Sequence, residues 1–266
     1  MVQKGFYSFF ISMILTSKNN SLVKETALLK EKKARRETGL FLVEGVKMTT
    51  ECQKSGLEIE RVFIAEDSGY TAETLGVDEG KVVLVSNDVL RLLSDEKTPQ
   101  GVLCRVKMPT RSLCAPKNPC LILDGVADPG NMGAIIRTAN AAGYNEIYLV
   151  DGCVDPFSPK SVRASMSGIF FTTVYFGSRE EILSVMQDTP IIVADMQGEN
   201  VFTFAPPAKY AIVIGNEANG VSKEMREGAT STVKIPMEAT QESLNAAVSA
   251  GVLMYLFKRE TFLKTK

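Results

Sequence analysis

The 266-residue sequence contains no histidine and no tryptophan. Without histidine, the chain lacks the side chain that most often acts as a general base near neutral pH. This absence excludes Ser-His and Cys-His nucleophilic catalysis and removes the commonest zinc ligand. Because tryptophan is missing and no cluster of other aromatic residues stands out, no obvious platform for stacked bases is present.

Cysteine is scarce, and charge of one sign does not dominate. The five cysteines form no C-x-x-C pair: Cys52, Cys104, Cys114, Cys120 and Cys153. We therefore expect reduced thiols, with neither a disulfide framework nor a bound metal. The net charge of −1 means that any nucleic-acid binding must come from a local basic patch. The 45% hydrophobic and 23% charged residues are typical of a globular protein.

Hydrophobic runs long enough to cross a membrane are also missing. The apolar stretch from Phe6 to Leu15 is about half of the ~20 residues that a bilayer span needs. It resembles a signal peptide weakly, but no small-residue cleavage site follows it. We favour translation from Met13, with residues 1–12 as an upstream extension, and expect a cytoplasmic protein without a membrane partner.

Residues 13–106 have the pattern of a small α/β domain. An amphipathic helix is predicted over residues 21–38 and should end at Gly39, and a helix should follow from Val46 to Gly56. Apolar runs predict strands at residues 40–44, 59–65, 81–86 and 101–106, with a helix at 87–95. Residues 107–119 contain three prolines and no apolar periodicity, which indicates a linker between two domains.

Residues 120–266 predict a second α/β domain. Short, almost uninterrupted apolar runs at 120–126, 146–152, 171–177, 190–196 and 210–216 are typical of parallel strands covered on both faces. Helical stretches at 133–143, 158–168 and 178–188 separate them, and a strongly apolar helix is predicted over 243–260. This alternation predicts a doubly wound, largely parallel sheet.

Two glycine-rich turns resemble nucleotide-binding loops, but their spacing is wrong. In "GNEANGVS" the position of the phosphate-binding lysine of a Walker A loop holds Val221. In "DGVADPGNMG" the glycines do not follow the G-x-G-x-x-G spacing of a dinucleotide-binding turn. A dinucleotide-dependent enzyme is therefore disfavoured.

Three polar clusters follow presumed strands, at the edge where open α/β sheets bind their ligands. In "DPGNMGAIIRTANAAG", Asn131 could simply cap the helix, whereas Arg137 lies among apolar residues and should be a partly buried cation that needs an anion. In "IVIGNEANGVS", Asn216 and Glu217 stand between two glycines, which could be no more than a tight turn.

The third cluster is "KIPMEATQESLNAAVSA". Here Ser243 could be an ordinary helix N-cap, and Asn245 fits that role less well. Each cluster by itself could be structural, but the order of all three is informative.

Together the three clusters resemble the motifs of the SpoU (TrmH) family of RNA 2′-O-ribose methyltransferases, in the SPOUT class. The resemblance covers residues 120–260. Residues 13–106 are more weakly similar to that family's substrate-binding domain, through "FLVEGVK" and "PQGVLCRV". One departure is "RASMSGIFF", where a Gly-Ala pair is expected after Met166 and Ser167-Gly168 stands instead.

The resemblance implies a deep trefoil knot in the C-terminal domain, S-adenosylmethionine as cofactor, and a homodimer with composite active sites. The apolar C-terminal helix is then the natural interface. It implies cofactor contacts along 194–196 and at the second and third motifs: Ala194, Met196, Gly215, Asn216, Ile235, Met237 and Leu244.

The resemblance also implies catalytic candidates: Arg137, Asn131, Glu217, Ser243 and Asn245. The family mechanism casts Arg137 as the activator of the ribose hydroxyl. We prefer an electrostatic role, in which Arg137 stabilises the developing alkoxide and binds a phosphate. Glu217 or a substrate phosphate would then accept the proton, while Asn131 and Asn245 orient Arg137 and the ribose.

RNA binding has a signal of its own in "KEKKARR", which supplies Lys30, Lys32, Lys33, Arg35 and Arg36. These residues could form a solvated helix face, but beside a methyltransferase domain they predict a phosphate-binding patch. Lys160 and Arg163 are weaker candidates. We favour 23S ribosomal RNA as substrate over tRNA. The alternative is a non-catalytic RNA-binding or ribosome-assembly factor on the same fold.

Overall fold

The computed structural model describes residues 14–240 and 243–264, so the expectations for residues 1–12 lie outside the described residues. The chain divides between Lys107 and Met108 into two compact units, and each unit is described by itself.

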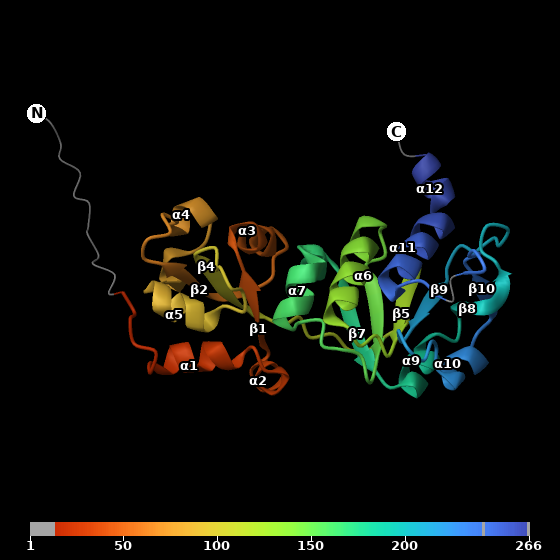
Figure 1. Ribbon diagram of the computed structural model, residues 1–266, viewed down its shortest axis with the longest axis horizontal. Helices are drawn as coiled ribbons and strands as arrows, with labels where there is room; N and C mark the ends of the chain where they lie inside the picture. The colour runs from red at the N-terminus through yellow and green to blue at the C-terminus, as the bar shows by residue number, and fades with distance from the viewer. Residues whose placement is uncertain (1–13, 241–242, 265–266) are drawn as a thin grey trace, which may run out of the picture. The chain divides into compact units, whose positions relative to one another are not determined.

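The first unit is built on a four-stranded mixed sheet with the order β1-β4-β2-β3 (Figure 1). Only the β2–β3 pair is parallel. The strands are β1 (Leu40–Glu44), β2 (Ile59–Ala65), β3 (Val82–Val85) and β4 (Val102–Lys107). The helices are α1 (Ser21–Leu28), α2 (Lys32–Thr38), α3 (Val46–Lys54), α4 (Ala72–Leu75) and α5 (Asn87–Leu93), with a 3-10 turn η1 (Glu79–Lys81). The predicted strands and the α3 and α5 helices are confirmed.

The single helix predicted over residues 21–38 is wrong, because the chain breaks between α1 and α2. Arg35 stabilises the break, because its guanidinium donates to the carbonyl oxygens of Leu29 and Lys30, at 2.8 and 2.7 Å. These carbonyls would otherwise lack partners at the end of α1. The predicted end at Gly39 is confirmed, with a left-handed φ of 66°.

The second unit contains a six-stranded parallel sheet in the order β10-β8-β9-β5-β6-β7. The strands are β5 (Cys120–Asp124), β6 (Glu146–Val150), β7 (Thr173–Gly177), β8 (Ile191–Asn200), β9 (Ala211–Gly215) and β10 (Ser231–Lys234). All residues of β5 are buried, as the apolar run predicted. The chain runs from β5 outward through β6 and β7 and then returns to the other side of β5, so the strand order reverses there.

Helices cover both faces of this sheet, which confirms the doubly wound prediction. One face carries α6 (Pro129–Ala141), α7 (Pro159–Ser165), α8 (Gly168–Phe171) and α11 (Ala246–Phe257) (Figure 1). The other carries α9 (Arg179–Val185) and α10 (Lys223–Glu227), and α12 (Arg259–Leu263) follows α11. The last helix was predicted as one element from Ser243; it begins at Ala246 and breaks at Lys258. Residues 108–119 pack on this unit, since the Tyr148 hydroxyl donates to the Cys114 carbonyl at 2.9 Å.

Two glycines bring α7 and α8 unusually close to α6. A Cβ at Gly133 would lie 2.5 Å from Ala164 and from the Ser161 carbonyl oxygen. A Cβ at Gly168 would lie 3.0 Å from Cα of Arg137. The Ser167-Gly168 departure therefore puts the glycine where α6 requires it. The turn before it is strained, because Met166 has a φ of 50°, which a side chain disfavours.

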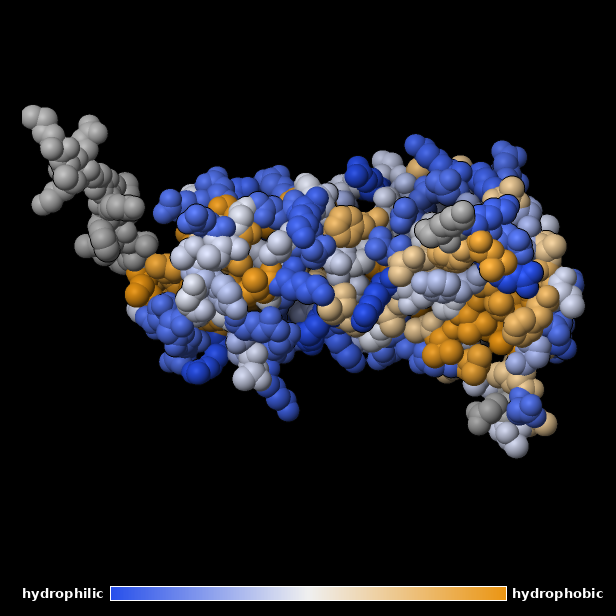
Figure 2. All heavy atoms as spheres, turned by 90° about the horizontal axis from the view of Figure 1, so that it is seen from above, coloured by the Kyte–Doolittle hydropathy of each residue, from blue (hydrophilic) through white to orange (hydrophobic). Residues whose placement is uncertain are grey.

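The surface of the second unit has an apolar area (Figure 2). Hydrophobic residues of α11 and α12 that are exposed to solvent include Val248, Tyr255, Phe262 and Leu263. Tyr255 and Phe262 stack with ring centroids 5.2 Å apart. No helix in the described part of the chain is long and apolar enough to span a membrane.

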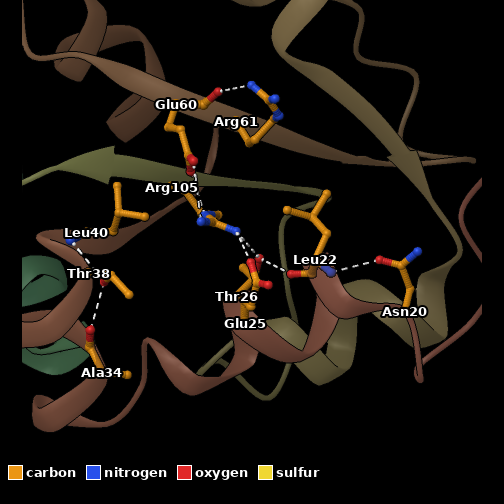
Figure 3. Close-up of polar contacts among 10 residues, drawn as sticks. All are labelled: Asn20, Leu22, Glu25, Thr26, Ala34, Thr38, Leu40, Glu60, Arg61 and Arg105. Carbon is orange, nitrogen blue, oxygen red and sulfur yellow. Dashed lines mark hydrogen bonds and ion pairs between the residues drawn. The ribbon is translucent and has the colours of Figure 1, made fainter.

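In the first unit, a buried arginine on β4 fastens α1 to the sheet (Figure 3). The Arg105 side chain is 7% exposed, and its Nε lies 2.7 Å from Oε2 of Glu60 without forming a hydrogen bond to it. Nη2 donates to Oε1 of Glu60 at 3.4 Å, while Nη1 donates to Thr26 at 3.4 Å and lies 3.8 Å from Glu25, both on α1. The guanidinium therefore bridges β2 and α1 across β4.

Candidate active site

A cavity of about 370 Å³ opens beside the middle of β8 and at the carboxyl ends of β9 and β10. Its position is the one at which parallel α/β sheets bind ligands. Every residue expected to contact the cofactor lines it: Ala194, Met196, Gly215, Asn216, Ile235, Met237 and Leu244. Two of the catalytic candidates, Glu217 and Ser243, line it as well.

The loop after β9, residues 215–222, closes tightly on itself. The backbones of Asn216 and Gly220 exchange two hydrogen bonds of 2.9 Å. A Cβ at Gly215 would lie 2.3 to 2.5 Å from backbone atoms of Gly220 and Val221, so only glycine fits there. The Asn216 side chain accepts from two loop amides and donates to the Gly125 carbonyl at 2.7 Å. The loop is thus a preformed wall of the cavity.

The side chain of Asn131 joins all three sequence motifs. It donates to Glu217 Oε1 at 2.8 Å and accepts at 2.9 Å from the side-chain amide of Asn245. Glu217 also accepts from the backbone amides of Ala127 and Asp128, at 3.1 and 3.3 Å. The first motif is therefore tied to the second through Glu217 and to the third through Asn245.

These hydrogen bonds set the charge state of Glu217. Partial burial opposes ionisation, but the donors Asn131, Ala127 and Asp128 outweigh it and lower the pKa of the carboxyl. The pKa of Asp128 is also lowered, first by the backbone amide of Asn131, with Lys160 adding to the effect. Both groups are therefore carboxylates near neutral pH. A carboxylate with three donors and a lowered pKa is a weak proton acceptor.

The structure excludes two structural alternatives, namely that Asn131 and Ser243 only cap helices. The N-cap of α6 is Asp128, which accepts from the Asn131 backbone amide at 2.9 Å. The N-cap of α11 is Asn245 and not Ser243, since Asn245 accepts from the amides of Ala247 and Val248. Because Asn131 is released from capping, its side chain is free to link Glu217 to Asn245.

Arg137 does not lie where the sequence suggested. It was expected to be partly buried, but it is exposed on α6, whose buried face consists of Met132, Gly133, Ile135, Ile136 and Ala139. Among the described residues no hydrogen bond or ion pair engages its guanidinium, and it does not line the cavity. In the hydrogen bonds of the described residues, Asn131 engages Glu217 and Asn245 engages Asn131, and Arg137 takes part in neither contact.

An ion pair in the cavity wall escaped the sequence analysis. Nη2 of Arg226 lies 3.0 Å from Oδ2 of Asp195, and its Nε donates to the Val221 carbonyl at 3.0 Å. Both residues line the cavity. Asp195 lies in the middle of β8, between Ala194 and Met196, which were both predicted to contact the cofactor. The pairing with Arg226 depends on tertiary structure, and no local sequence pattern indicates it.

A second arginine holds the loop from the sheet side. The side chain of Asp124, at the end of β5, is fully buried and lies 2.8 Å from Nη2 of Arg179. Nε of Arg179 donates both to Asp124, at 3.0 Å, and to the Ser222 hydroxyl, at 2.9 Å. The Ser222 amide donates to the other oxygen of Asp124 at 2.7 Å.

The predicted basic patch in the first unit is smaller than expected. Arg35 is 2% exposed, and Lys30 donates to the carbonyls of Leu92 and Ser94 at 2.8 and 2.6 Å, so both are structural. Lys32, Lys33 and Arg36 are exposed on α2. In the second unit Lys160 is exposed and lies 3.5 Å from Asp128, whereas Arg163 is half-buried.

The cavity suits the cofactor that the resemblance implies. Its volume falls within the range of small-molecule sites, and apolar side chains such as Ile214, Val221 and Ile235 line it beside backbone and charged groups. S-adenosylmethionine combines a flat apolar base with a polar tail, and it needs both kinds of lining. Among the described residues no group of three acidic or cysteine side chains is placed to hold a metal ion.

Comparison with known proteins identifies both units. Residues 118–255 match the SpoU rRNA Methylase family, and residues 20–104 match the MRM3-like substrate binding domain. The 23S rRNA (guanosine(2553)-2′-O)-methyltransferase RlmP of Bacillus subtilis is 28% identical, over 91% of this chain and 97% of that protein. The 23S rRNA (uridine(2479)-2′-O)-methyltransferase of Streptomyces viridochromogenes is 30% identical, over 91% of this chain and 90% of that protein.

A solved structure agrees over both units. The AdoMet-bound rRNA methyltransferase from Sinorhizobium meliloti has a TM-score of 0.85 and 26% identity, covering 93% of this chain and 98% of that one. The family match spans more than half of the chain, and the similarity extends over nearly all of it. The chain belongs to the SpoU rRNA methylase family.

Proposed function

We propose that this protein transfers a methyl group from S-adenosylmethionine to a ribose 2′-hydroxyl of ribosomal RNA. The observation that carries the proposal is the hydrogen-bonded chain from Asn245 through Asn131 to Glu217, at the edge of the cavity. It joins three segments whose residue types and order are those of the family.

The cavity residues of β8 and of the 215–222 loop, together with Ile235, Met237, Ser243 and Leu244, would hold the cofactor. When bound, its sulfonium supplies an activated methyl group. The protein must therefore align the ribose oxygen and manage a single proton. Gly215 matters because its missing Cβ lets the loop close into a wall.

Arg137 is the residue we propose for stabilising the alkoxide. A guanidinium stays protonated in proteins, so it serves better as a charge and a forked donor to phosphate than as a base. Glu217 is a weak proton acceptor for the reasons given above, which favours a substrate phosphate or water for this step. We propose that Glu217 instead fixes the 127–131 loop, so that Asn131 and Asn245 present a defined edge to the ribose.

The position of Arg137 supports a composite site. Its guanidinium is exposed and does not line the cavity of its own chain. The apolar surface of α11 and α12 offers an interface for a second copy (Figure 2). We therefore propose a homodimer in which Arg137 of one copy works at the cavity of the other. We also propose the trefoil knot in the segment that lines the cavity, and a cytoplasmic location.

We favour 23S rRNA as the substrate. The relatives from Bacillus subtilis and Streptomyces viridochromogenes are both named as 23S rRNA 2′-O-methyltransferases. The match of residues 20–104 to a substrate binding domain of the same group supports rRNA over tRNA. The exposed Lys32, Lys33 and Arg36 on α2 would contact phosphates.

The test is transfer of labelled methyl to separated, unmodified 23S rRNA, 16S rRNA and tRNA. Label in 23S rRNA that survives alkali as a resistant dinucleotide is the expected result. Arg137→Ala should lose most of the transfer while binding the cofactor normally, and Arg137→Lys should also be impaired because it lacks the fork. Near-full turnover by Arg137→Ala would refute its role. Absence of both transfer and cofactor binding would favour an RNA-binding scaffold.

A further inference from the structure

Asp124 is linked to both ends of the 215–222 loop, to one through its backbone and to the other through its carboxylate. Asp124 pairs in register with Gly215, where the loop begins, because β5 and β9 are neighbouring parallel strands. Its Oδ2 accepts from the amide of Ser222, where the loop ends, at 2.7 Å. A single buried residue thus ties the two ends of the loop together, through its backbone at Gly215 and its side chain at Ser222.

Arg179 supplies the opposite charge beside that buried carboxylate. The Asp124 side chain is fully buried, and a buried carboxylate needs an opposite charge and several donors. Arg179 supplies two of its nitrogens to Oδ1, at 2.8 and 3.0 Å, and its Nε also reaches the Ser222 hydroxyl at 2.9 Å. Arg179 therefore contacts both the end of β5, at Asp124, and the end of the loop, at Ser222.

We propose that Asp124 and Arg179 are positioning residues that hold the 215–222 loop in the shape that accepts S-adenosylmethionine. This inference rests on the proposed function. Neither residue lines the cavity, so neither contacts the cofactor there. They act through Ser222, which fixes the exit of the loop, while Gly215, Asn216 and Val221 form the cavity wall.

A general contribution to stability has a different signature from a positioning role. A variant that only destabilised the fold would bind the cofactor normally at a temperature where it remains folded. A loop released at Ser222 must be reordered whenever the cofactor binds, so affinity falls even in the folded protein. Because the chemical groups are untouched, the rate at saturating cofactor changes much less, which is the pattern of lost uniform binding.

The experiment compares the wild-type chain with Arg179→Met, Arg179→Lys and, as a control, Arg259→Met. Arg259 pairs with Glu260 at 3.1 Å, and both side chains are about two-thirds exposed. Calorimetric titration with S-adenosylmethionine, at a temperature where circular dichroism shows folded protein, should give an affinity about tenfold or more weaker for Arg179→Met. Arg179→Lys should recover part of that loss and Arg259→Met should bind normally, while kcat for Arg179→Met stays within about threefold.

Hydrogen exchange of the cofactor-free chain gives an independent readout. The amides of residues 216–222 should exchange faster in Arg179→Met, and those of β6 and β7 should not change. If folded Arg179→Met binds S-adenosylmethionine with wild-type affinity, or if exchange in the loop is unchanged, this inference is overturned and the proposed function still stands. Failure of the wild-type chain to bind S-adenosylmethionine overturns the proposed function, and this inference with it.

Discussion

Asn131 donates its side-chain amide to a carboxylate oxygen of Glu217 over 2.8 Å, although the two residues are 86 positions apart in the chain. The carboxylate also accepts the backbone amides of Ala127 and Asp128. Glu217 therefore accepts hydrogen bonds from three donors within residues 127–131. Its negative charge, more than its basicity, is the property on which the arrangement depends.

Replacing Glu217 by glutamine should lower methyl transfer by about ten- to a hundredfold, because the amide cannot accept all three donors and charged hydrogen bonds contribute about 1.5–3 kcal/mol. Cofactor affinity should change much less than turnover. Rate and affinity would be measured by labelled methyl transfer and calorimetry. Glu224→Gln is the matched control on exposed α10 and should behave as wild type. Full activity of Glu217→Gln would contradict this role.

The lowered pKa values of Glu217 and Asp128 predict the direction of the acid response. In the unfolded chain these groups titrate near the ordinary values of 4.5 and 3.8. Their folded pKa values are lower, so their contribution to stability is complete above the ordinary values and is lost as the pH falls through the folded ones. In urea unfolding, the stability difference between wild type and Glu217→Gln should shrink in this acid range. A difference that stays constant between about pH 7 and pH 3 would contradict the prediction.

Asn245 combines a capping role with a link to Asn131, and two variants separate these roles. Asn245→Ala should lose about 1 kcal/mol of unfolding free energy along with most activity. Asn245→Ser should keep the cap and the stability but lose activity, because serine cannot reach Asn131 with an amide. Ser86→Ala, which removes the N-cap of α5, should lose stability without losing activity. Normal turnover by Asn245→Ser would mean that the cap alone matters.

Arg105 and Lys107 lie on the same strand and allow a matched comparison of ion pairs. Arg105→Met should lower the unfolding free energy of the first unit by about 2 kcal/mol, since it leaves the partly buried Glu60 without its cation. Lys107→Ala breaks a 2.8 Å pair with Glu58, but both side chains are more than half exposed, so solvent screens the pair and the loss should be much smaller than for Arg105→Met. Equal losses in urea unfolding would argue against the burial effect.

The exposed cations of α2 should control the salt dependence of RNA binding. Changing Lys32, Lys33 and Arg36 together to glutamine should reduce the slope of log affinity against log salt by about 2. Lys30→Gln should leave the slope unchanged and destabilise the unit, because Lys30 bonds the carbonyls at the end of α5. Fluorescence anisotropy with rRNA fragments would measure the slopes. An unchanged slope in the triple variant would exclude α2 from the RNA contact.

The residues that line the cavity were implied by the resemblance to the family, and the strand pattern predicted only the edge of the sheet at which they lie. Apolar runs end at Ala194 and Gly215, and parallel strands bring their carboxyl ends to one edge. The prediction that Arg137 is partly buried was wrong. It was based on the apolar residues adjacent to Arg137 in the sequence and not on those that share its face of the helix. Ile136 and Ala139 point to the core, and a residue adjacent to Ile136 is turned about 100° away.

Other features depend on tertiary contacts that no local pattern contains. The sequence of residues 29–31 continues a helical pattern. In the structure the carbonyls of Leu29 and Lys30 instead accept hydrogen bonds from the guanidinium of Arg35, which ends the helix. Asp128 and Asn131 are equally good caps by residue type, and the choice between them depends on Glu217, which lies far away in the sequence. The Asp195–Arg226 pair likewise exists only once β8 and α10 have been placed.

The pairing of β5 with β9 has a consequence for folding. Leu121 pairs with Ile212 and Asp124 with Gly215, so the strand that carries the loop must find a partner about ninety residues earlier in the chain. Parallel pairings of such long range close slowly, because the chain entropy is lost before the contacts form. Helical signal should therefore return early during refolding, and the ability to bind S-adenosylmethionine should return last.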